Sequence, residues 1–184
     1  MRSDGAVTIR PLRINDAAQM CAAVVESVVE VGRWLPWCHE GYTLEEAASF
    51  IELSAKGWAD KARFVFGIFD TGDDVFLGTI SINHIVATNR LANLGYWVRT
   101  LRTRQGIALA AARLVARFAF EELRLTRLEI VCIPENLPSR RVAEKIGSKL
   151  EAISRDRLVM HGKSYDAAVY SLLPTDLENS GVTQ

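Results

Sequence analysis

The sequence predicts an α+β fold, in which a mixed and mostly antiparallel sheet carries helices on both faces. Some segments repeat apolar residues at helical spacing and others alternate them as strands do, and the two kinds follow one another without strict alternation. With 184 residues the chain is long enough for one domain with a substantial core. We therefore expect one domain over residues 1–175 and a polar, frayed tail over residues 176–184.

Composition limits the partners of this domain. Hydrophobic residues make up 49% of the chain and charged residues 24%, as in soluble globular proteins. The 22 basic and 22 acidic side chains cancel, so no overall field attracts nucleic acid or a membrane. The three cysteines are odd in number and His39, His84 and His161 stand apart, so neither a disulfide framework nor a metal site is expected. Because no apolar run resembles a signal peptide or a membrane span, we expect a cytoplasmic protein.

The first expected elements are a strand and a helix. Residues Val7 to Leu12 alternate as a strand does, and Pro11 suits an edge position. Asn15 then stands where a helix N-cap is expected, with Asp16 in the first turn. The helix should end before Gly32 and should bury an apolar stripe formed by Ala18, Cys21, Ala22, Val25 and Val29.

A connector with two tryptophans leads to the second helix. Trp34 and Trp37 flank a proline and fit neither the helical nor the strand period, which indicates a packed connector. Thr43 and Glu46 form a capping box, so a second helix should begin there and run until Gly57 closes it.

The remaining strands and a short helix are predicted from alternation and turn residues. In chain order they are a hairpin of residues 64–69 and 75–86, a strand over 90–99, a strand over 128–133, a helix over 138–145, and a hairpin of residues 150–158 and 165–173.

The longest helical pattern begins at Gly106 and runs to about Glu122. Its core-facing stripe consists of Ile107, Ala111, Leu114, Val115 and Phe118. The first turn of a helix has unpaired N–H groups and partial positive charge, so it attracts anions. Gly106 and the small Ala108 leave room for an anion, and Arg102 and Arg104 add charges that suit phosphate oxygens. A phosphate cradle is one interpretation, and a plain strand-to-helix connection is the other. The spacing excludes a P-loop and a dinucleotide motif.

Two motifs resemble those of the GNAT superfamily of N-acetyltransferases. Gln105-Gly106-Ile107-Ala108, after a strand ending Gly95-Tyr96-Trp97-Val98, resembles the loop that holds the pyrophosphate of acetyl-CoA. The segment from Asn136 to Gly147 resembles the second cofactor motif of the superfamily, at the expected distance downstream. Together with the Arg33 to Trp37 segment, these motifs are similar to the RimJ/RimL-like branch of ribosomal-protein N-terminal acetyltransferases, over nearly the whole chain.

The resemblance implies a cofactor site and a splayed sheet. The strands ending near Arg99 and Ile133 should separate, with the cofactor arm in the gap between them. The expected contacts with acetyl-CoA are Trp97, Val98, Arg99, Arg102, Arg104, Gln105, Gly106, Ile107, Ala108, Asn136, Arg141 and Lys145. For Arg141 and Lys145, ordinary surface charge is the alternative.

The resemblance also implies catalytic roles. Acetyl transfer from a thioester needs a neutral amine, a polarised carbonyl and a proton for the leaving thiolate, but no covalent nucleophile. Asn136 should contact the cofactor near its reactive end. Many members of the superfamily place a tyrosine as general acid where this chain has Ala143. Ser139, one turn earlier, is the expected donor to the sulfur, and a helix-start hydroxyl is the alternative for it.

The general base and the acceptor contacts are less defined. Glu129, on the strand before Asn136, and His84 are the candidate bases, with a solvated glutamate and a structural histidine as the alternatives. A bound water is a further carrier, because a terminal α-amine has a pKa of about 8. Trp34, Trp37 and His84 are the expected substrate contacts.

We therefore expect acetyl transfer from acetyl-CoA to a primary amine, first of all the N-terminal α-amine of a protein such as a ribosomal protein. A small amine such as a polyamine or an aminoglycoside is the alternative substrate, because Glu40, Glu45 and Glu46 gather near the connector. A non-catalytic acyl-CoA-binding module is the third interpretation, because Ala143 replaces the tyrosine. Nucleic acid, membranes and metals are not expected partners, and a homodimer is left open.

Overall fold

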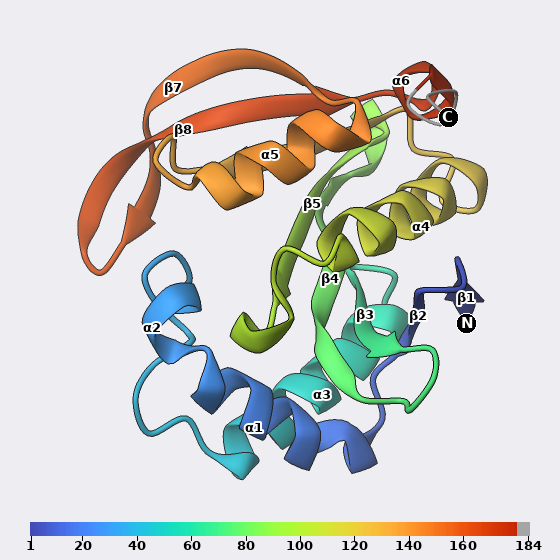
Figure 1. The fold of residues 1–184 in the computed structure, drawn as a ribbon. Coiled ribbons are helices and arrows are strands. Elements are labelled where there is room, and N and C mark those ends of the chain that lie inside the picture. Colours follow the sequence, from blue (N-terminus) through green and yellow to red (C-terminus); the bar gives the residue numbers. More distant parts are fainter. Residues whose placement is uncertain (180–184) are drawn as a thin grey trace.

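The computed structural model describes residues 1–179 and contains one eight-stranded sheet (Figure 1). The strands follow the order β1-β2-β3-β4-β5-β6-β8-β7, and every neighbouring pair is antiparallel except β5 and β6. Their bounds are β1 Arg2–Ser3, β2 Val7–Pro11, β3 Phe64–Asp70, β4 Phe76–Val86, β5 Leu91–Val98, β6 Arg127–Cys132, β7 Lys149–Met160 and β8 Lys163–Leu172. The predicted α+β class, with a mixed and mostly antiparallel sheet, is confirmed.

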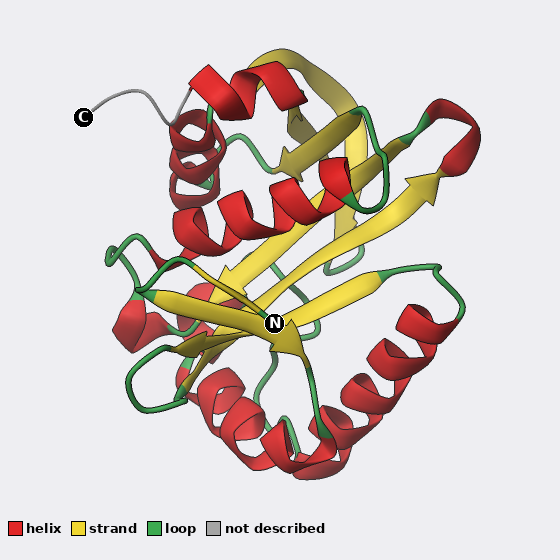
Figure 2. Ribbon diagram, turned by 90° about the vertical axis from the view of Figure 1, so that its right-hand side faces the viewer, coloured by secondary structure: helices red, strands yellow, loops and turns green. Residues whose placement is uncertain are grey.

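Helices cover both faces of this sheet, as Figure 2 shows. Their bounds are α1 Ala17–Glu26, α2 Val28–Val31, α3 Leu44–Ala59, α4 Ile107–Glu121, α5 Leu137–Ile146 and α6 Pro174–Asn179. One core lies between the sheet and helices α4 and α5, and a second lies between the sheet and helices α1 and α3. Strand β3 serves both, because Phe66 and Ile68 face the first core while Val65 and Phe69 face the second.

The sheet divides between β5 and β6. Their parallel pairing consists of three residue pairs and ends at Asn93 and Glu129. Beyond that point β5 continues to Val98 along β4, and β6 continues to Cys132 along β8. The two strands therefore part, which confirms the splay that the resemblance implied. The β7–β8 half leans away from the β2–β5 half in Figure 1.

The N-terminal helix differs from the prediction in its start and its buried face. The Asp16 carboxylate, and not Asn15, accepts from the Arg13 N–H at 2.7 Å, and it also pairs with Arg10 at 2.7 Å. This buried ion pair lies directly before the first residue of α1. The residues that the helix buries are Ala17, Met20, Ala23 and Val24, whereas the predicted Val25 and Val29 are 54% and 80% exposed.

The other local predictions mostly match the structure. Thr43 and Glu46 form the predicted capping box of α3, both hairpins are present, and α4 begins after Gly106. Gly57 does not close α3, which continues to Ala59. A Cβ at Gly57 would lie 2.6 Å from the side chain of Arg63, so the glycine serves packing. Residues 176–179 of the expected tail belong to α6, and residues 180–184 lie outside the described part.

Candidate functional site

The N-terminus of α4 has the backbone geometry expected of an anion site. Gly106 is the N-cap residue at φ +79°, a conformation that favours glycine, and Arg104 two residues earlier is at φ +62°. The first intrahelical bond runs from the Ala110 N–H to the Gly106 carbonyl at 3.0 Å. The N–H groups of the first turn therefore lie at the open end of the helix. A Cβ at Gly106 would meet nothing within 4 Å, so the backbone here is open to a ligand.

The three arginines around this turn have different surroundings. Arg99 donates to both carboxylate oxygens of Glu26 and, at 3.2 Å, to the Phe76 carbonyl, so its side chain is turned toward α1. These bonds lower the pKa of Glu26. A cofactor contact of Arg99 stays a prediction, and with the side chain engaged by Glu26 it would fall to the backbone. Arg102 is half-exposed and lies 3.7 Å from Asp70, and Arg104 is exposed.

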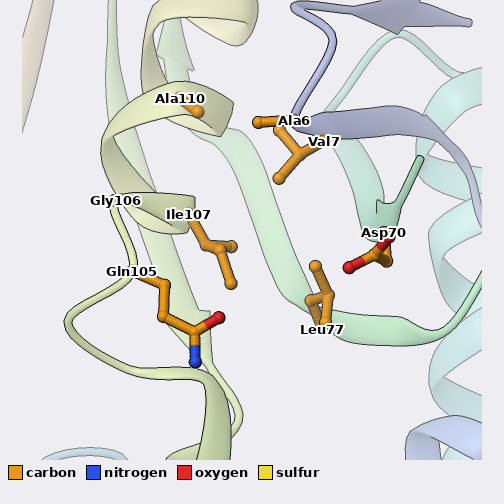
Figure 3. A pocket seen from close by; sticks show the side chains of 8 residues that line it. All are labelled: Ala6, Val7, Asp70, Leu77, Gln105, Gly106, Ile107 and Ala110. Atoms are coloured by element: carbon orange, nitrogen blue, oxygen red, sulfur yellow. The ribbon is translucent and has the colours of Figure 1, made fainter. Parts of the chain in front are cut away.

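A small hollow of ≈ 350 Å³ lies beside the start of α4 (Figure 3). Its described lining comes from β2, from the β3–β4 hairpin and from α4, namely Ala6, Val7, Asp70, Leu77, Gln105, Gly106, Ile107 and Ala110. These residues lie on the side of α4 away from the β5–β6 splay. Because Asp70 adds negative charge here, the hollow is poorly suited to a phosphate. The anion site is therefore better placed on the other side of the turn, toward the splay.

Helix α5 begins beside that splay, and its cap is Asn136. The side-chain oxygen of Asn136 accepts from the Ser139 N–H at 3.2 Å. The Ser139 hydroxyl is thus not the cap. It lies instead 3.3 Å from the phenol oxygen of Tyr96, which also donates to the Ser139 carbonyl at 3.0 Å. Cys132, at the end of β6, contacts the same hydroxyl.

The groups around Ser139 are uncharged near neutral pH. Burial raises the pKa of Tyr96, and the bond with Ser139 only partly opposes that effect. Burial likewise raises the pKa of the Cys132 thiol. A neutral phenol can donate a hydrogen bond, whereas a neutral buried thiol is a poor nucleophile. The cluster therefore suits hydrogen bonding to a leaving group better than covalent catalysis.

A second phenol anchors α5 from β8. The Tyr170 hydroxyl accepts from Arg140 Nε and donates to Glu144, each at 2.9 Å. The Tyr170 ring is 1% exposed, whereas Arg140 is half-exposed and Glu144 is exposed, so the ring is buried under the helix and its hydroxyl group reaches the edge of the core. Ala143, at the position of the superfamily tyrosine, is fully buried. Arg141 and Lys145 are exposed on the outer side of α5.

Glu129 stands at the base of the splay and is already paired. Its carboxylate accepts from Arg127 Nε and Nη2 at 3.1 and 2.9 Å, and Arg127 also pairs with Glu151. Alternation puts Glu129 on the face opposite Leu128 and Ile130, which belong to the core under α4. Its role as a base stays a prediction, with the ion pair against it.

Two of the predicted substrate contacts, Trp37 and His84, lie apart from each other in the structure. Trp37 is 40% exposed and packs edge-on against Trp97 at a ring-centroid distance of 5.4 Å. The Trp97 side chain is buried in the second core, so a cofactor contact at this residue is left to its backbone. Trp34 stacks with Arg33. His84 lies exposed in the bulge near the far end of β4, where β5 and β6 still pair, and so apart from Trp37.

An open groove of ≈ 400 Å³ extends from Trp37 along α3. It is lined by Trp37, His39, Tyr42, Glu45, Glu46, Ser49, Phe50 and Leu53. His39 pairs with Glu46 at 3.0 Å, and bonds to the Glu40 carbonyl and to Glu46 raise the pKa of His39. The groove is therefore lined by both apolar or aromatic side chains and acidic side chains. The first group is Trp37, Tyr42, Phe50 and Leu53, and the second is Glu45 and Glu46.

Comparison with known proteins decides the family. Residues 6–149 match the model of the acetyltransferase (GNAT) domain. The chain belongs to the GNAT acetyltransferase family. It is accordingly an acetyl-CoA-dependent N-acetyltransferase, which sets aside the non-catalytic interpretation.

Several GNAT relatives have names that refer to ribosomal proteins. The chain is 32% identical to the Bacillus subtilis protein named "Putative ribosomal N-acetyltransferase YdaF", over 94% of this chain and 93% of the relative. It is 28% identical to the ribosomal-protein-serine acetyltransferase of Escherichia coli, over 66% of this chain and 64% of the relative. Among solved structures, Mycobacterium smegmatis RimJ in complex with CoA-disulfide superposes with a TM-score of 0.85 at 26% identity, covering 96% of this chain and 86% of that one.

The structure thus brings two GNAT motifs to the two sides of one splay. The α4 turn comes from one motif and Ser139 from the other, while Tyr96 was missed as a site residue. The sequence offered one indication of Tyr96. It stands beside Trp97 in the strand of the first motif, and strand alternation puts its side chain on the same face as the buried Leu94. Among residues 1–179 there is no group of three or more potential metal ligands. No helix in that range is long and apolar enough to cross a membrane.

Proposed function

We propose that the protein acetylates the N-terminal α-amine of a protein, such as a ribosomal protein, by direct attack of the amine on the thioester of acetyl-CoA. The observation that carries this proposal is the open groove beside Trp37. Its length along α3 and its apolar or aromatic side chains suit an extended peptide that follows the amine. The ribosomal names of the relatives support the same acceptor.

The chain's own residues supply a fitting cofactor site. The open backbone at Gly106 and the first-turn N–H groups of α4 suit the pyrophosphate, and Arg104 adds positive charge, while Arg102 would have to leave its pair with Asp70 to add more. Acetyl-CoA supplies the activated thioester. Ser139, at the other side of the splay, is the group that would donate a hydrogen bond to the departing sulfur.

Direct attack is favoured over a covalent enzyme intermediate. Cys132 is a potential nucleophile beside Ser139, but it is buried and burial raises the pKa of its thiol. The attacking amine must lose a proton, and a terminal α-amine with a pKa of about 8 can pass it to water. Glu129, whose carboxylate Arg127 already holds, is not required for that step.

A second candidate acceptor is a small polycationic amine. Glu45 and Glu46 line the groove and would attract positive charge. Against this candidate, Glu46 already binds the Thr43 N–H at 2.9 Å and pairs with His39. The carboxylate of Glu45 alone is a weak basis for selecting a multivalent cation.

The test is a panel of amines incubated with the purified protein and acetyl-CoA, read by thiol release and by mass spectrometry of the products. The panel contains a peptide with a free N-terminus, the same peptide with a blocked N-terminus and a free internal lysine, and spermidine. We expect acetylation at the free N-terminus and much slower reaction of the other two. Preferential acetylation of spermidine, or of the internal lysine, would contradict the proposal.

A further inference from the structure

The phenol of Tyr96 links the two halves of the sheet across the splay. Tyr96 lies on β5 three residues beyond Asn93, where pairing with β6 has ended. Its hydroxyl reaches α5, which follows β6, and donates to the Ser139 carbonyl oxygen at 3.0 Å. The phenol oxygen also lies 3.3 Å from the Ser139 hydroxyl. These contacts tie the helix that carries Ser139 to the opposite side of the gap.

The backbone of Ser139 is hydrogen-bonded at both its N–H group and its carbonyl group. Asn136 accepts from its N–H, and Tyr96 donates to its carbonyl, so the backbone of Ser139 has little freedom. The hydroxyl is left out of the capping. Because its hydrogen turns about the Cβ–Oγ bond, the hydroxyl can donate to the Tyr96 oxygen at rest and to a sulfur during the reaction without displacement of the oxygen.

We propose that Tyr96 is a positioning residue for acetyl transfer, which holds the Ser139 hydroxyl toward the leaving sulfur. This inference rests on the proposed function. In the reaction the amine nitrogen forms a bond with the acetyl carbon, the carbon–sulfur bond breaks, and its electron pair goes to sulfur. Ser139 donates a hydrogen bond to that sulfur. Water then protonates the thiolate and takes the surplus proton of the amine. Tyr96 does not touch the reacting atoms and acts through the placement of Ser139.

Tyr96→Phe is the direct test, because it removes the hydroxyl and keeps the ring. Tyr170→Phe is the matched control, since it removes a second hydroxyl that also binds α5, at Arg140 and Glu144. We expect kcat to fall about tenfold in Tyr96→Phe, the typical effect of one neutral hydrogen bond, with KM for acetyl-CoA within about twofold of wild type. In Tyr170→Phe we expect kcat close to wild type.

A double-mutant cycle with Ser139→Ala separates positioning from a general loss of structure. If Tyr96 acts through Ser139, Tyr96→Phe should cause less than about a twofold further loss of kcat in the Ser139→Ala protein. Equal losses of kcat in Tyr96→Phe and Tyr170→Phe, or independent effects of Tyr96→Phe and Ser139→Ala, would overturn the inference. An unchanged kcat in Ser139→Ala would overturn it too, while the N-terminal acetylation activity of the wild type would still stand. Absence of turnover in the wild type with every amine would instead remove the proposed function itself.

Discussion

The side-chain oxygen of Asn136 accepts the backbone N–H of Ser139 at 3.2 Å and so caps helix α5. From the sequence alone, the Ser139 hydroxyl could be either the cap of this helix or a hydrogen-bond donor in the site, and this bond assigns the cap to Asn136. Asn136 performs the structural task of the helix start, and the Ser139 hydroxyl faces Tyr96 and Cys132 instead. The cap uses the oxygen of the amide, and its NH₂ group is a separate donor.

The first prediction concerns these two atoms of Asn136. Asn136→Ala removes the cap and should lower the free energy of unfolding by about 1 kcal/mol. Asn136→Asp keeps an oxygen that can cap but removes the NH₂ donor, so it should keep the stability. If the NH₂ group contacts the cofactor, Asn136→Asp should still weaken acetyl-CoA binding. Melting temperature and acetyl-CoA affinity of both variants check this, and a loss of stability in Asn136→Asp would contradict the capping role.

The second prediction concerns the α4 turn. Acetyl-CoA at about one hundred times its dissociation constant should stabilise the wild type by about 2.7 kcal/mol, seen as a rise in melting temperature. Gly106→Val should abolish that rise, because valine is strained at φ +79° and its side chain stands where the anion would approach.

Gly41→Val is the matched control for strain. Gly41 has the same φ of +79°, and a Cβ added there would also meet nothing within 4 Å. Both variants should melt at a lower temperature than the wild type, but Gly41→Val should keep the rise caused by acetyl-CoA. If Gly106→Val also keeps the rise, the α4 turn does not bind the pyrophosphate.

The third prediction concerns the pair of Glu26 and Arg99, which ties the end of α1 to the end of β5. Hydrogen bonds from Arg99 lower the pKa of Glu26 below its usual 4.5. A lowered folded-state pKa stabilises the protein above the unfolded-state pKa, and this stabilisation is lost as the pH falls through the folded-state value. Glu26→Gln should therefore be less stable at neutral pH, by about 1 to 3 kcal/mol, and should lose less stability on acidification.

Urea denaturation between pH 7 and pH 3 measures this difference. Glu30→Gln is a suitable control, because Glu30 lies one turn further along and accepts from the Thr100 hydroxyl at 3.2 Å. Its stability should follow the wild type across the whole range. Parallel pH profiles of Glu26→Gln and the wild type would mean that the Arg99 pair contributes little.

The fourth prediction concerns the acceptor groove. Trp37→Ala removes a ring that borders the groove and packs on Trp97, so KM for the acceptor peptide should rise about tenfold. Affinity for acetyl-CoA should stay unchanged, because Trp37 packs on the Trp97 ring, whereas a cofactor contact of Trp97 would use its backbone. Trp34→Ala removes a tryptophan that stacks on Arg33 and does not line the groove, and it should leave the acceptor KM near wild type. A similar KM increase in both variants would argue against this groove as the acceptor site.

The sequence by itself determined the features that depend on neighbouring residues. The capping box at Thr43, the turns of both hairpins and the start of α4 at Gly106 each rest on contacts within a few residues, so local rules were enough. The two cofactor motifs were recognisable for the same reason, and the family assignment followed from them.

Only the tertiary structure decided which distant side chains meet. Apolar periodicity does not reveal even the buried pair of Arg10 and Asp16, although the two residues are only six positions apart. Arg99 is hydrogen-bonded to Glu26, which lies 73 positions away in the sequence, and Tyr96 is hydrogen-bonded to Ser139, which lies 43 positions away. The first contact joins the end of β5 to α1, and the second joins β5, which has parted from β6 after Asn93, to α5 on the other side of the splay. Such distances in space depend on the packing of the whole sheet, and no local pattern in the sequence encodes them.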